Sequence, residues 1–117
     1  SNIQSVFKDK SEKTVRIYLS YEDRLKLLGF ELFVVQNKHN DLISVYYKVN
    51  KFDTDGIFLV NYKNKIVITE VSSVSSKFIV IVEEKKEIKI ATTDIQAVAK
   101  LFGHIKIIET IPFGVTK

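Results

Sequence analysis

The sequence predicts a single α+β domain, mostly an antiparallel sheet of about seven to eight strands with two short helices packed on it. Three observations predict this fold class. Short apolar segments follow one another from residue 14 onward, and many of them alternate apolar with polar residues. Only a few residues separate these segments, and short connections join antiparallel neighbours. Two other segments repeat apolar residues at helical spacing after a polar residue that suits a helix N-cap.

The length and composition are those of one globular domain. The chain has 117 residues, and its single proline and four glycines form no linker that would divide it. Hydrophobic residues make up 45% of the chain, which excludes a disordered protein. Residues 1–13 are mostly polar, so we expect an N-terminal tail or linker there and one domain over residues 14–117. Because the chain starts with Ser1 and contains no methionine, we also expect it to be part of a longer protein.

Cysteine is absent from the sequence, which excludes disulfides and zinc–thiolate sites. No apolar run approaches the roughly 18 residues that a membrane span needs. We therefore expect a soluble protein. The absence of cysteine does not decide the compartment, and the sequence only slightly favours the cytoplasm.

The first strand and the first helix are predicted side by side in the chain. Thr14–Leu19 alternates in polarity, as a half-buried strand does. Ser20 suits the N-cap of a helix, and Gly29 suits the left-handed residue that follows a helix. We predict a helix over Tyr21–Leu28 that must pack on the sheet, because two turns are too few to persist alone. Its apolar stripe consists of Tyr21, Leu25 and Leu28.

Six more strands are predicted in close succession, joined by turns rich in Asn, Asp, Gly and Ser. Two of them, Phe30–Gln36 and Lys77–Glu83, are apolar on both sides, which indicates strands buried on both faces. The other four are Leu42–Val49, Ile57–Tyr62, Lys65–Val71 and Glu87–Ala91.

The second helix has the strongest local pattern. Thr93 and Gln96 have the spacing of a capping box, and Gly103 is placed to end the helix. We therefore predict a helix over Asp94–Phe102, followed by a last strand over Ile105–Ile108. The apolar stripe of this helix consists of Ile95, Val98, Ala99 and Phe102.

No motif in the sequence predicts catalysis, a cofactor or a metal. His39 lies in a turn, and His104 follows the expected helix end, where a cation complements the helix dipole. Asp53 and Asp55 precede Gly56 like the start of a calcium loop, but the remaining oxygen ligands are missing, so the segment reads as a β-turn. The scattered glycines form no phosphate-binding loop. We predict no catalytic, cofactor-binding or metal-binding residue, which favours a protein that is not an enzyme.

The function that we expect first is a non-enzymatic interaction or assembly module that docks a protein partner. An exposed sheet edge can accept another strand, and this is one way in which such a partner binds.

Two alternatives stay open. The first is a nucleic-acid-binding surface, which the net charge of +4 and aromatic residues near lysines favour. Aromatic rings stack on bases and lysines follow phosphates, and Phe52 lies beside this surface in the sequence. The second is a small-ligand binder or an enzyme that uses Asp55, Glu70 and His104. The candidate nucleic-acid surface consists of Tyr46, Lys48, Lys51, Tyr62, Lys63 and Lys65.

Overall fold

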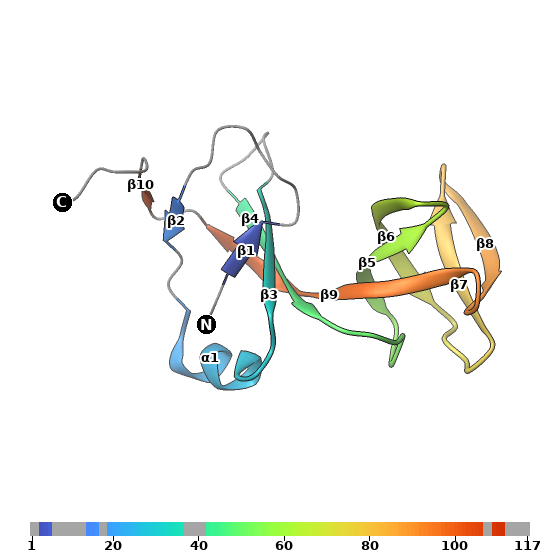
Figure 1. The fold of residues 1–117 in the computed structure, drawn as a ribbon, viewed down its shortest axis with the longest axis horizontal. Coiled ribbons are helices and arrows are strands. Elements are labelled where there is room, and N and C mark those ends of the chain that lie inside the picture. The colour runs from blue at the N-terminus through green and yellow to red at the C-terminus, as the bar shows by residue number, and fades with distance from the viewer. Residues whose placement is uncertain (1–2, 6–13, 17–18, 37–41, 107–108, 112–117) are drawn as a thin grey trace. The chain divides into compact units, whose positions relative to one another are not determined.

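Strands make up most of the protein, as the alternating segments predict (Figure 1). The computed structural model describes residues 3–5, 14–16, 19–36, 42–106 and 109–111. The one helix in these ranges is α1 (Tyr21–Leu27). The strands are β1 (Ile3–Ser5), β2 (Thr14–Arg16), β3 (Leu32–Gln36), β4 (Leu42–Lys48), β5 (Gly56–Tyr62), β6 (Lys65–Ser72), β7 (Phe78–Glu83), β8 (Lys86–Ala91), β9 (Ile95–Lys106) and β10 (Glu109–Ile111).

Eight strands form one sheet in the order β1-β3-β4-β9-β5-β6-β7-β8, and β10 pairs with β2. The pairs β5–β6, β5–β9, β6–β7 and β7–β8 are antiparallel, whereas β1 and β3 run parallel. The predicted fold class, a mostly antiparallel sheet of seven to eight strands with helix, is confirmed. Strand β1 lies within residues 1–13, the segment that we expect to be a tail.

The six strands predicted between residues 30 and 91 correspond to β3–β8, with ends that agree within two residues. Predictions for the turn around His39, for residues 17–18 and 107–108, and for the segment after residue 111 lie outside the described residues.

Helix α1 begins where the sequence predicts it. The backbone N–H of Asp23 donates to the Ser20 side chain over 3.1 Å, so Ser20 is the N-cap. Gly29 has the expected left-handed conformation, with φ of +86°. The helix ends at Leu27, and Leu27 is its one buried residue. The predicted stripe of Tyr21, Leu25 and Leu28 is exposed, because the burial of this short helix is confined to its last turn.

The prediction of a second helix over Asp94–Phe102 is wrong, because this segment belongs to strand β9. Residues 92–94 form a tight turn, closed by a hydrogen bond of 2.9 Å from the Asp94 N–H to the Ala91 carbonyl, so Thr93 caps no helix. The same sequence also fits an alternating pattern, in which Ile95, Ala97 and Ala99 are buried. Gly103 and His104 likewise lie within β9, so neither residue ends or caps a helix.

The tertiary partner decides between these two patterns. Strand β9 pairs with β5 from Phe58 to Tyr62. If this segment were a helix, the backbone N–H and C=O groups along that edge of β5 would lose their partners. Ala97 and Ala99 are small, which lets the two strands lie close to the core. Long-range pairing with β5 therefore outweighs the local capping residues in this segment.

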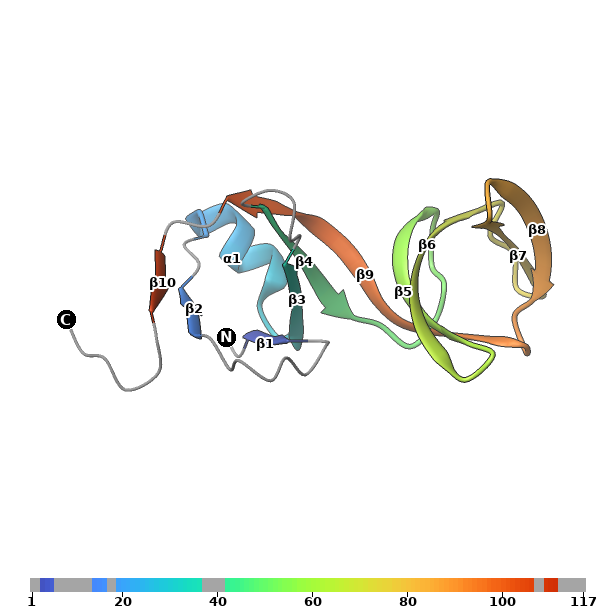
Figure 2. The same ribbon diagram turned by 90° about the horizontal axis from the view of Figure 1, so that it is seen from above.

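The chain divides into two compact units, residues 46–101 and the remainder. The first of these carries β5–β8 and the N-terminal half of β9, in the order β9-β5-β6-β7-β8. Figure 2 shows β5–β8 curving around the interior of this unit. Its core cluster consists of Phe58, Val60, Val71, Ile79, Ile81, Ile90, Ile95 and Ala97. Truncation of a buried phenylalanine such as Phe58 to alanine typically costs about 3–5 kcal/mol.

Two hairpins of this unit have turns of two residues with positive φ. Lys63 and Asn64 connect β5 to β6, with φ of 51° and 62°. Glu84 and Lys85 connect β7 to β8, with φ of 49° and 65°. Positive φ at both central residues is typical of the type I′ turn, which suits the twist of antiparallel strands.

Candidate ligand-binding groove

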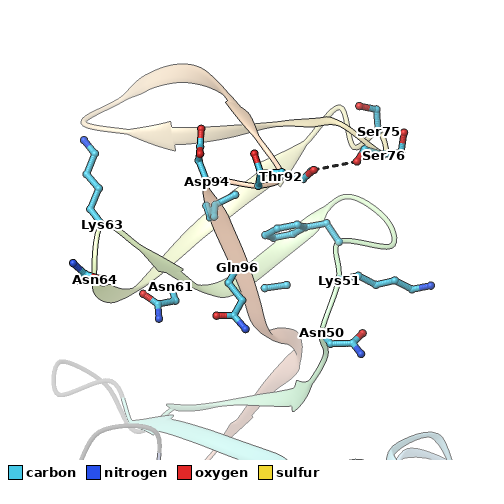
Figure 3. Close-up of a pocket in the computed structure, with 14 residues that line it drawn as sticks. Asn50, Lys51, Asn61, Lys63, Asn64, Ser75, Ser76, Thr92, Asp94 and Gln96 are labelled. Carbon is cyan, nitrogen blue, oxygen red and sulfur yellow. Dashed lines mark hydrogen bonds between the residues drawn. The ribbon is translucent and has the colours of Figure 1, made fainter.

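A groove of about 750 Å³ lies on the unit formed by residues 46–101 (Figure 3). Its polar lining is dominated by amides and hydroxyls, and Figure 3 shows Lys63 and Lys51 at opposite sides, with Asn61 and Gln96 between them. Three apolar side chains complete the lining. The lining residues are Asn50, Lys51, Phe52, Asn61, Lys63, Asn64, Ser75, Ser76, Thr92, Thr93, Asp94, Ile95, Gln96 and Ala97.

The pairing of β5 with β9 brings two amides of the lining together. Asn61 and Gln96 lie directly opposite each other across these two strands. Residues opposite each other in an antiparallel ladder project from the same face of the sheet. Both side chains are exposed, so two amides stand side by side on rigid strands.

Hydrogen bonds between side chains and backbone hold one wall in place. The Thr92 hydroxyl donates to the carbonyls of Ser76 and Lys77 over 3.0 and 3.3 Å. The Ser75 hydroxyl accepts from the Phe78 N–H over 3.0 Å. The serine-rich segment before β7 is therefore a hydrogen-bonded turn that presents Ser75 and Ser76 to the groove.

Another part of the lining is the segment that carries Lys51 and Phe52, and two contacts anchor it. The Phe52 ring meets the buried Phe58 ring edge to face, with 5.1 Å between centroids. Asp53 and Thr54 directly follow Phe52 in the chain. The Lys100 ammonium lies 3.3 Å from the Asp53 carboxylate and also donates to the Thr54 hydroxyl. Both contacts fix the segment against the core strands.

The Asp53 carboxylate responds to this anchoring. Partial burial raises the pKa of Asp53, but the Thr54 N–H and the Lys100 ammonium outweigh this effect and hold the pKa below its ordinary value of 3.8. Lys100 also lies 5.3 Å from the centroid of the Phe58 ring. Gly56 leaves room for this lysine, because a Cβ at Gly56 would lie 2.9 Å from Lys100 Cε. The predicted turn at Asp53–Gly56 is thus a docking point for Lys100.

The charge of the groove is slightly positive. Lys51 and Lys63 line it together with one carboxylate, Asp94. Neither lysine forms an ion pair with a carboxylate among the described residues. The Lys63 ammonium lies over the Tyr62 ring, 5.1 Å from its centroid. Two cations are thus available to an anionic ligand.

The candidate nucleic-acid residues from the sequence separate into three groups. Lys51 and Lys63 come together in the groove. Tyr46 is only 2% exposed, and burial raises the pKa of its hydroxyl; Tyr62 packs against the core cluster, so neither ring is a surface platform. Lys48 and Lys65 are exposed and are not among the residues that line the groove.

The three described residues considered for an enzyme or small-ligand site share no hydrogen bond with one another. Asp55 accepts a hydrogen bond from the Val74 N–H over 3.4 Å, Glu70 is exposed on β6, and His104 lies on β9. No hydrogen bond connects any two of these three described side chains. Instead, His104 Nδ1 shares a hydrogen bond of 2.9 Å with the Ser44 hydroxyl. No carboxylate among the described residues orients His104, so this pair lacks the third member of a nucleophilic relay.

Within the described ranges, no three His, Asp or Glu residues gather in a cluster that could hold a metal ion. No helix there is long and apolar enough to cross a membrane. No protein-family model matches the chain, and no curated protein matches it.

The sequence alone does not reveal the amides of the groove. The sequence places Asn61 and Asn64 at the connection between two predicted strands, Ile57–Tyr62 and Lys65–Val71, and Gln96 in a capping box. The local pattern gives no sign that Asn61 and Gln96 are neighbours, because their pairing depends on β9 being a strand.

Proposed function

We propose that this chain is a non-enzymatic interaction module that docks an extended segment of a protein partner in the groove on residues 46–101. The observation that carries the proposal is the pair of amides, Asn61 and Gln96, which lie opposite each other across β5 and β9 and line the groove. A side-chain amide offers both a donor and an acceptor, which are the two groups that a peptide unit presents. Hydroxyls of Ser76 and Thr93 extend the same chemistry along the groove.

The lysines favour an acidic segment. Lys51 and Lys63 have no carboxylate partner among the described residues, so an Asp or Glu of the ligand would supply one at each side of the groove. Each such exposed pair contributes roughly 0.2–1 kcal/mol. The amides then provide most of the positioning, and the lysines select the sign of the charge.

Single-stranded nucleic acid is the second candidate, because the same two lysines could contact phosphates. The stacking surface supports it less well. Tyr46 is buried, Tyr62 packs on the core cluster, and the Phe52 ring is already engaged with Phe58. Stacking on exposed rings supplies much of the affinity of single-strand binders. A protein ligand therefore fits the groove better.

Fluorescence anisotropy tests the proposal with three labelled probes: oligoglutamate, a neutral glycine–serine peptide, and oligothymidine. We expect oligoglutamate to bind best and to weaken as salt rises, because the charge contacts are exposed. The double variant Lys51→Glu with Lys63→Glu should lower its affinity about tenfold, since two attractive contacts become repulsive.

Lys65→Glu is the matched control, because Lys65 is exposed, belongs to the predicted basic surface and lies outside the groove. Its binding should match that of the unmodified chain. A second pair of variants, Asn61→Asp and Gln96→Glu, keeps the side-chain size and should also weaken oligoglutamate binding. Tighter binding of oligothymidine, lost with Lys51 and Lys63, would favour the nucleic-acid candidate instead. Absence of binding by all three probes at low salt would refute both.

A further inference from the structure

Strand β8 is the last strand of the eight-stranded sheet, so one of its edges has no strand partner among the described residues. Its neighbour on the other side is β7, in a register that places Glu83 opposite Lys86 across the turn. In a hairpin with a two-residue turn, the residues that flank the turn form a hydrogen-bonded pair. Hydrogen-bonded and non-hydrogen-bonded pairs then alternate along the ladder.

This alternation directs the backbone groups of Glu87 and Lys89 toward the open edge, whereas those of Ile88 point toward β7. Two hydrogen bonds at the far end of the hairpin agree with it. The Thr92 N–H donates to the Lys77 carbonyl over 2.9 Å, as a bonded pair should. The Ala91 carbonyl accepts from Asp94 over 2.9 Å, so it points away from β7.

The side chains along this edge have a self-complementary order. Glu87 and Lys89 lie on one face, on either side of Ile88, which lies on the face toward the core. Neither Glu87 nor Lys89 forms an ion pair with another described residue. The Lys89 ammonium lies 4.5 Å from the centroid of the exposed Phe78 ring, on the same face.

We propose that two copies of this chain pair through β8, with the two β8 strands antiparallel and Ile88 at the two-fold axis. A two-fold antiparallel pairing centred on Ile88 places Glu87 opposite Lys89 of the second copy, and Lys89 opposite its Glu87. These are the positions whose backbone groups point outward, so each pair also exchanges backbone hydrogen bonds. Ile88 meets Ile88 of the second copy on the core side, and the two sheets become continuous.

The charges select this partner among those that an open edge admits. Opposite charges directly across two strands stabilise their pairing, and like charges destabilise it. The alternation Glu87-Ile88-Lys89 satisfies both ionic pairs only in the two-fold register. A charged edge that served only to keep strands apart would need no such order, because lysines alone do that. The interface does not use the groove lining, so it stands independently of the proposed peptide binding.

Sedimentation equilibrium over a range of protein concentrations tests the proposal. We expect the unmodified chain to dimerise, and Lys89→Glu or Glu87→Lys alone to weaken dimerisation at least about tenfold, because each change creates two repulsive pairs. The double variant Glu87→Lys with Lys89→Glu is the matched control, since it restores both pairs in swapped order. It should dimerise like the unmodified chain.

A mixture of the two single variants gives a sharper test. One carries two acidic residues on the edge and the other two basic residues, so the mixture should form heterodimers while each variant alone stays monomeric. Monomers at every concentration of the unmodified chain would overturn the proposal. A dimer that all these substitutions leave unchanged would overturn it too, because its interface would lie elsewhere. The variant Glu87→Lys with Lys89→Glu should still bind oligoglutamate, because its groove is unchanged. This measurement distinguishes a wrong dimer interface from a groove that binds no peptide.

Discussion

Lys100 connects several parts of the protein through a single side chain. Its ammonium contacts the Asp53 carboxylate and the Thr54 hydroxyl, and its stem lies against the position of Gly56. The side chain is only 13% exposed, so its charge is held close to the core strands. Asp53 compensates that charge. Lys51 and Phe52, which line the groove, directly precede Asp53 in the chain.

Replacement of Asp53 by asparagine should therefore lower the stability in a pH-dependent way. The pKa of Asp53 is depressed by folding, so its contribution is complete above the ordinary value of 3.8 and disappears as the pH falls through the folded pKa. Asp53 is half exposed, which limits the loss at neutral pH to roughly 0.3–1 kcal/mol. Urea unfolding at pH 7 and near pH 2.5 measures it.

Glu70→Gln is the control, because Glu70 is exposed and makes no hydrogen bond through its side chain to another described residue. Its free energy of unfolding should equal that of the unmodified chain at both pH values. An Asp53→Asn variant that lost the same free energy at low and neutral pH would contradict an electrostatic role.

For single residues, the sequence predicts the chemical character of a surface better than the position of each side chain. It placed Lys51 and Lys63 on one candidate surface, and the groove brings them together. It also placed Tyr46 on that surface, although the side chain is buried. Alternation assigns Tyr46 to the face of its strand opposite Val45, but both residues are buried, so the strand is covered on both faces there. That second layer of cover depends on segments far away in the sequence.

Strand β9 shows what local patterns can and cannot decide for an element. Thr93, Gln96 and Gly103 fit the start and end of a helix, and the same segment also alternates like a strand. The pairing with β5 decides that the segment is a strand, and no residue within the segment indicates that pairing. The strands β4–β8 were predictable because each is a short alternating or continuously apolar run bounded by turn residues.

The β7–β8 turn is an element that can be improved. Glu84 and Lys85 both have positive φ, which costs residues other than glycine of order 1 kcal/mol each. Glu84→Asn with Lys85→Gly gives the preferred sequence of a type I′ turn and should raise the free energy of unfolding by about 1 kcal/mol. Urea denaturation at a fixed protein concentration measures this gain.

The matched control places the glycine one residue later. Lys86→Gly puts it in a strand, where glycine lowers stability by roughly 0.5–1 kcal/mol. Equal effects of the two glycine substitutions would show that backbone conformation at the turn is not the reason for the gain.

Among the described residues, more buried side chains lie in the unit of residues 46–101 than in the other unit. All eight members of the core cluster lie in the unit of residues 46–101. Helix α1, in the other unit, buries only Leu27. The sequence does not predict this distribution, because the order of strands in the sheet depends on contacts between distant segments.

Hydrogen exchange should reflect this difference. We expect the backbone amides of β5 and β6 to be the most slowly exchanging, and those of α1 to exchange much faster, because a short helix with one buried side chain opens locally. Mass spectrometry of peptic peptides, or NMR, measures both in one experiment. Equal protection of α1 and β5 would mean that the helix opens only when the whole chain unfolds.

The wall of the groove also determines how a binding measurement can be interpreted. Its shape depends on bonds from the Thr92 and Ser75 hydroxyls to the backbone, and neither partner carries a charge. Ionic strength and moderate changes of pH therefore leave this wall unaltered. The charged groups of the site lie elsewhere: Lys51 and Lys63 line the groove, and the Lys100–Asp53 ion pair anchors the segment that carries Lys51. A dependence of affinity on salt therefore reports these charges and those of the ligand, and not a change in the wall formed by Thr92 and Ser75.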